Sequence, residues 1–162
     1  MKLLMYSFFI LLIAPCNSSK KLAETTDVST SKAVISYQTT ACFGRCPIYA
    51  LTINGENKTA TFIGTQNTEK IGTFTKSISS KELNSFVKAF EDAQFNSLNN
   101  EYLGNITDFP IKLITYSNNG KTKIIKSRSG APETLTNLEK LLNDYANSDG
   151  WKKTEDSSNS KD

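Results

Sequence analysis

The chain has 162 residues, of which 38% are hydrophobic and 22% charged, and its formal net charge is +3, values that are ordinary for one soluble globular domain. It contains no histidine. This absence excludes Ser-His-Asp and Cys-His nucleophilic catalysis, zinc or haem sites with histidine ligands, and pH switches based on histidine.

The first sixteen residues have the pattern of a secretory signal. Lys2 precedes an apolar run over residues 3–14, which is shorter than the about 20 residues that a membrane-spanning helix needs. Residues 13–16 read IAPC and are similar to a bacterial lipobox, so we expect export to a bacterial cell envelope and lipidation of Cys16. Cleavage by ordinary signal peptidase is the alternative. Removal of residues 1–15 takes away one Lys and no acid, which leaves a charge of 18 minus 16, or +2, and predicts no nucleic-acid partner.

Two polar segments flank the predicted domain. Residues 17–31 read NSSKKLAETTDVSTS and lack an apolar period, so we expect a disordered tether with a root-mean-square span of about 20 Å. Residues 152–162 are equally polar and are expected to form a disordered tail. A single folded domain is therefore predicted over residues 32–151.

Six segments within this domain are predicted to be β-strands from their alternation of apolar and polar residues or their content of β-forming residues. Turn residues at 54–57 and 118–120 join four of them into two hairpins. The predicted strands cover residues 33–37, 48–53, 59–63, 71–78, 111–116 and 121–127.

Two helices complete the predicted order ββββαββα. Ser79 and Glu82 have the spacing of a capping box, and an apolar stripe then continues to about Phe95. A second stripe follows Pro132 and ends near Tyr145. We therefore predict an α+β fold, an antiparallel sheet of about five to six strands with both helices on one face.

The segment ACFGRCPIY between the first two predicted strands has the least common pattern in the chain. If processing consumes Cys16, the mature domain keeps only Cys42 and Cys46, and a structural disulfide is the favoured interpretation because Gly44 permits a sharp turn. A redox-active pair beside Arg45 is an alternative, although the spacing is C-x3-C. A metal site is disfavoured because two thiolates lack suitable further ligands, and no metal or other cofactor is predicted.

These motifs carry a resemblance to a known family. C-F-G-x-C-P-x-Y-x-L-x-I, a helix ending in A-x-F-x-x-L, a T-D-x-P stretch and a G-A-P-x-x-L-x-x-L-E helix resemble domain of unknown function 6438 over about residues 33–146. The resemblance implies a small protein of the bacterial envelope and implies no chemistry, because the activity of the family is unassigned. It also implies that the Cys loop and Asp108 belong together. The residues that carry it are Cys42, Gly44, Cys46, Pro47, Tyr49, Phe95, Leu98, Tyr102, Asp108, Pro110, Gly130, Ala131 and Pro132.

Four residues are candidate binding residues: Phe43, Arg45, Tyr49 and Asp108. Phe43 either projects from the loop beside Arg45 or folds inward and caps the core. Asp108 either stabilises a turn through its side chain or is the anionic partner of Arg45 or of a ligand. No second carboxylate has a spacing that predicts a glycosidase acid pair, and no catalytic residue is assigned.

Two functions from different classes follow. The first is a non-enzymatic envelope lipoprotein, anchored to the membrane by its N-terminal lipid, that binds an envelope protein or another envelope component near the Cys loop. The alternative is an envelope thiol oxidoreductase that uses Cys42 and Cys46.

Overall fold

The computed structural model describes residues 32–154 of the chain. The predicted signal peptide, the lipidation site Cys16, the tether and most of the predicted tail lie outside the described residues. The elements are, in chain order, β1 (Val34–Thr39), β2 (Ile48–Asn54), β3 (Thr59–Gln66), β4 (Gly72–Ser77), α1 (Ser80–Asp92), the short 3-10 helix η2 (Phe95–Ser97), β5 (Glu101–Tyr102), β6 (Lys112–Asn118), β7 (Lys121–Ser127), α2 (Glu133–Ala146) and β8 (Lys152–Lys153).

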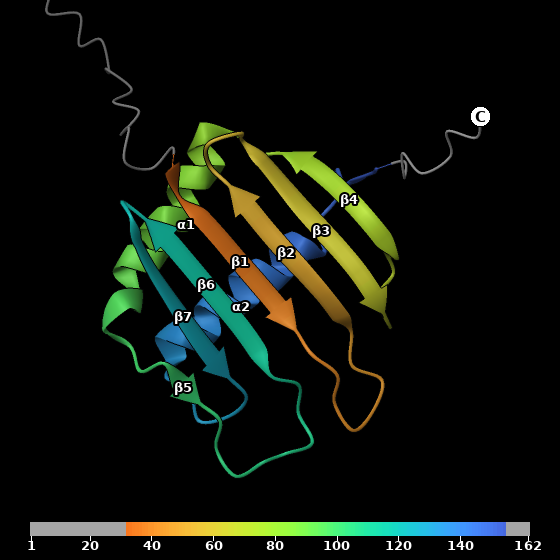
Figure 1. The fold of residues 1–162 in the computed structure, drawn as a ribbon, viewed down its shortest axis with the longest axis vertical. Helices are drawn as coiled ribbons and strands as arrows, with labels where there is room; N and C mark the ends of the chain where they lie inside the picture. The colour runs from red at the N-terminus through yellow and green to blue at the C-terminus, as the bar shows by residue number, and fades with distance from the viewer. Residues whose placement is uncertain (1–31, 155–162) are drawn as a thin grey trace, which may run out of the picture.

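The strands form one sheet in the order β5-β7-β6-β1-β2-β3-β4-β8. Its pairings are antiparallel except for β5 with β7, which is parallel. Both helices lie behind the same face of the sheet (Figure 1). The predicted α+β class and the placement of both helices on one face are therefore confirmed.

The predicted number of strands and their order match only in part, because β5 and β8 were not predicted. β5 and β8 contain only two residues each, too few to show any period in a sequence. They form because tertiary folding brings Glu101 opposite Lys126 and Lys152 opposite Thr75. β8 lies in the segment assigned to the disordered tail, so residues 152 and 153 are corrected from tail to strand.

The first helix ends earlier than the predicted Phe95. Its last residue is Asp92, and Gln94 then takes a left-handed conformation with φ of 49°. This reversal turns Phe95 back onto the domain, where its ring lies 4.9 Å from that of Phe90. The predicted capping box is confirmed, because the Ser79 hydroxyl accepts from the Glu82 N–H and the Glu82 carboxylate accepts from the Ser79 N–H.

The core lies between the sheet and the helices. Alternate residues of the central strands are buried against the helices, and the apolar stripes of α1 and α2 cover them. Two stacked pairs, Tyr49 with Phe62 at 5.2 Å and Phe90 with Tyr116 at 4.6 Å, mark its two halves. The opposite face of the sheet carries intermediate and exposed side chains, of which Ile124 is 49% exposed.

Two features are absent from residues 32–154. None of the helices in this range has both the length and the apolar character that a bilayer crossing requires. No group of three or more Cys, His, Asp or Glu side chains in the same range is arranged to bind a metal ion.

Candidate functional site

The Cys loop, residues 40–47, connects β1 to β2 at one end of the sheet. Cys42 and Cys46 form a disulfide, with their Cα atoms 5.8 Å apart, which confirms the predicted bond. Gly44 is not required for it, because its φ is not positive and an added Cβ would meet the Cys42 Sγ at 3.9 Å, an ordinary contact. The expectation that the bond depends on a glycine turn is therefore wrong.

Hydrogen bonds on both sides hold the loop in place. The Thr39 hydroxyl donates to the Pro47 carbonyl over 2.7 Å and accepts from the Tyr49 N–H over 3.2 Å. The Asn67 carboxamide, which follows β3, donates to the Cys46 carbonyl over 3.2 Å. The disulfide therefore closes the loop on itself, and these hydrogen bonds attach it to the sheet.

A second loop, residues 103–111, lies beside the Cys loop. The Phe43 N–H donates to the Asp108 carbonyl over 3.3 Å, and Thr40 and Ile111 exchange two bonds of 3.0 Å. Cys loop and Asp108 are therefore neighbours, as the family resemblance implies. The contact runs through the backbone, whereas the Asp108 carboxylate accepts only from the Thr107 hydroxyl, over 3.4 Å, among the described residues. Within the same residues neither the expected ion pair with Arg45 nor a side-chain turn bond is formed.

The two loops expose apolar side chains at their tips. Phe43 is 94% exposed, so it projects into solvent and does not cap the core. Ile106 and Phe109 on the second loop are 47% and 54% exposed. We name these exposed side chains of the two neighbouring loops, together with the exposed Arg45, the loop-end surface: Phe43, Arg45, Ile106 and Phe109.

Ile106 and Phe109 were not predicted from the sequence. The signal that could have found them is that both are apolar residues in a stretch with neither a helical nor a strand period. Tyr49 was predicted to be a binding residue but is buried. It is only 4% exposed and stacks in the core, so it supports the site from beneath and cannot touch a partner there.

The loop-end surface and the N-terminal end of the folded part lie at opposite ends of the sheet. β1 runs from Val34 toward the Cys loop, so Val34 lies at the other end of the sheet (Figure 1). Strands of six to eight residues separate the two ends by about 20 to 25 Å. The loop-end surface therefore faces away from the point where the chain joins the domain.

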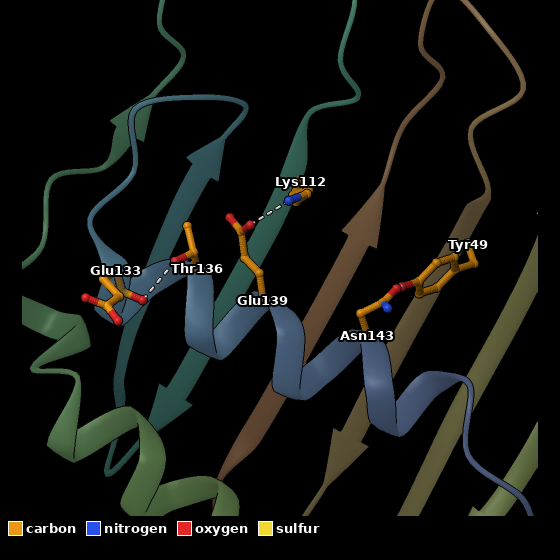
Figure 2. A network of polar contacts seen from close by, with 6 residues as sticks. All are labelled: Tyr49, Lys112, Glu133, Thr136, Glu139 and Asn143. Carbon is orange, nitrogen blue, oxygen red and sulfur yellow. Dashed lines mark hydrogen bonds and ion pairs between the residues drawn. The ribbon is translucent and has the colours of Figure 1, made fainter.

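A polar cleft lies on the helix side of the sheet, between α2 and the ends of β1 and β6. Its volume is about 380 Å³, and its walls are formed by Tyr37, Lys112, Thr136, Glu139, Lys140 and Asn143. Figure 2 shows the Glu139 carboxylate reaching from α2 toward Lys112 on β6, and Asn143 one turn along the helix reaching toward Tyr49. The ion pair measures 2.6 Å and the Tyr49 hydroxyl donates to the Asn143 Oδ1 over 2.7 Å.

Burial determines the electrostatics of this cleft. Glu139 is only 4% exposed, whereas the Lys112 side chain keeps 32% of its exposure. Desolvation raises the pKa of Tyr49 to about 12 and, together with the neighbouring Tyr49 and Glu139, raises the pKa of Tyr37 above its usual range. Both phenols are therefore neutral hydrogen-bonding groups at neutral pH. No sequence motif pointed to this cleft, because its wall residues come from three elements, β1, β6 and α2.

Comparison with protein families gives one match. The family described as "Domain of unknown function (DUF6438)" matches residues 33–146, which include the Cys loop, the second loop and all wall residues of the polar cleft. No curated protein matches the chain.

Proposed function

This chain belongs to the DUF6438 family, and from that premise we propose that it is a non-enzymatic binding module of the bacterial cell envelope. It is exported, held at a membrane by a lipid on Cys16 and a tether over residues 17–31, and binds a protein partner through the loop-end surface. Because the loop-end surface faces away from the start of the domain, the module presents it to partners away from its own anchor.

The exposure of Phe43 is the observation that carries this proposal. An aromatic ring that is 94% exposed adds almost nothing to folding, and this ring lies on a loop that a disulfide and several hydrogen bonds hold in place. Rigid aromatic side chains beside an arginine are the combination that is enriched in the energetic centres of protein interfaces. Ile106 and Phe109 extend the apolar area, and Arg45 has no ion-pair partner among the described residues.

Site-specific photo-crosslinking in the native envelope tests the proposal. A photoreactive residue at position 43 should give one defined protein adduct, and the same residue at position 124, on the far face of the sheet, should not. With the identified partner, Phe43→Ala should weaken binding at least about fivefold, or about 1 kcal/mol, and the matched control Ile124→Ala should leave it unchanged. Equal adducts from both positions, or equal affinity of both variants, would contradict a protein partner at the loop-end surface.

The alternative, a thiol oxidoreductase, is favoured by one contact. The Gly44 N–H donates to the Cys42 Sγ over 3.2 Å, a bond that would also stabilise a Cys42 thiolate. Against it, neither helix begins in the Cys loop, since α1 and α2 start at Ser80 and Glu133, so no helix dipole acts on the sulfur. Equilibration with glutathione buffers decides between them: a bond that stays oxidised at cytosolic poise supports the binding module, and a readily reduced bond supports the oxidoreductase.

A further inference from the structure

The polar cleft contains a buried charged group that folding alone does not explain. Glu139 lies on α2 beside the buried leucines of its apolar stripe, and its Oε1 atom is buried without a hydrogen-bond partner among the described residues. A buried ion pair contributes little to stability compared with apolar residues of the same volume, and a buried oxygen without a partner costs free energy. A ligand that completes the hydrogen bonds is one explanation of such a group.

Three polar groups at the wall of the cleft keep unused hydrogen-bonding capacity. Glu139 offers the free acceptor Oε1, and the Lys112 ammonium has two protons beyond the one it gives to Glu139. The Asn143 Oδ1 accepts from Tyr49, which turns the amide so that its NH2 group has no partner among the described residues. The cleft thus combines one strong acceptor with two donors at its wall.

The charges in the cleft cancel in pairs. Lys112 pairs with Glu139 over 2.6 Å, and Lys140 pairs with Asp144 over 2.5 Å on the next turn of α2. Because the pairs are neutral, a cation or an anion gains little net attraction there. Once the Glu139 carboxylate turns to bring Oε1 to the cleft surface, a hydroxyl group can donate to it while a neighbouring hydroxyl accepts from Lys112 or Asn143.

We propose that this cleft binds a neutral saccharide. Adjacent hydroxyl groups of a sugar ring match the acceptor and the two donors of the cleft wall. The cleft volume of about 380 Å³ lies at the lower end of the range of about 300 to 1,000 Å³ for small-molecule sites. The polar lining disfavours an apolar ligand. This site uses different residues from the loop-end surface, so the saccharide proposal does not depend on the proposed protein partner.

Three sugars that differ in charge test the proposal: glucose, which is neutral, glucosamine, which carries an ammonium group, and glucuronate, which carries a carboxylate. Titration of the labelled protein, followed by NMR, should move the side-chain amide signal of Asn143 with glucose, at millimolar affinity. Glucosamine and glucuronate should bind more weakly. Tighter binding of either charged sugar, or no movement with glucose at about 100 mM, would overturn the proposal, and the latter result would leave a water-filled cleft.

Variants separate a ligand site from a structural ion pair. Lys112→Met/Glu139→Leu removes the charged pair as a unit, and we expect it to melt at the same temperature as the wild type or higher and to lose glucose binding at least tenfold. Glu139→Gln, which keeps the shape, should lose at least threefold. The control Asp92→Asn, which removes one partner of an exposed ion pair on α1, should bind normally. A double variant that binds glucose as the wild type does would contradict the proposal, and so would one that melts well below it, because Glu139 would then be structural.

Discussion

Removal of the disulfide by Cys42→Ser/Cys46→Ser tests whether the bond acts mainly on the unfolded chain. The bond closes a loop with a sequence separation of four residues, for which the chain-entropy model gives about 2 kcal/mol. The native loop keeps its other attachments, including the bonds from Thr39 and Asn67, so the folded domain should survive. In a folded part of roughly 120 residues, about 2 kcal/mol corresponds to a fall in melting temperature of about 8 °C.

Urea unfolding of the wild type, the double serine variant and the wild type with reductant provides the measurement. The last two should agree, with an unchanged dependence on urea. Gly44→Ala is the matched control in the same loop, and we expect its stability to stay within about 0.5 kcal/mol of the wild type, because the added Cβ has room. A loss below about 0.5 kcal/mol would refute the entropy reasoning, and a loss above about 4 kcal/mol would mean that the native packing requires the bond.

Three further predictions concern stability. Phe43→Ala should lower the free energy of unfolding by only about 0.3 kcal/mol, since folding covers about 12 Å² of a side chain that is 94% exposed. Phe62→Ala in the core should lower it by about 3 to 5 kcal/mol. Thermal melts compare the two variants, and a similar loss for both would contradict the exposure of Phe43. The pKa values of Tyr37 and Tyr49 are raised in the folded state, so the folded domain keeps protons that the unfolded chain loses near pH 10. The free energy of unfolding should therefore be full below about pH 10 and fall toward pH 12. Urea unfolding across this range should show a shallower fall for Tyr49→Phe, and a rise in the free energy of unfolding with pH would contradict the assigned sign. Ser79→Ala removes the cap of α1 and should lower the free energy of unfolding by about 1 kcal/mol in the same assay. An unchanged free energy of unfolding would show that the capping box does not stabilise the domain.

The strands and helices that contain a full period could be read from the sequence. β2, with Tyr49, Leu51 and Ile53 on one face, and α1, with its capping box, are determined by local pattern and local hydrogen bonds. The disulfide could be predicted because the two cysteines are close in sequence and no others were expected in the mature domain. In each of these cases the partners are near neighbours along the chain.

The candidate sites depended on contacts between distant segments. The exposure of Phe43 could not be decided from the loop sequence, because an inward and an outward ring have the same local pattern, and only the packing of the finished domain leaves it outside. Asp108 reaches the Cys loop through a backbone bond that any residue could make, so the nature of the contact left no mark on the sequence.

What the sequence determined by itself is the fold class, the principal elements, the disulfide and the family, because each rests on a local pattern. Only the tertiary structure decided that β5 and β8 exist and that Glu139 is buried against Lys112, which is 27 residues away along the chain. The sequence presents Glu139 as one more charged residue on a helix. Its burial is decided by the neighbouring strands, because the energetic state of a carboxylate depends on which groups surround it in space.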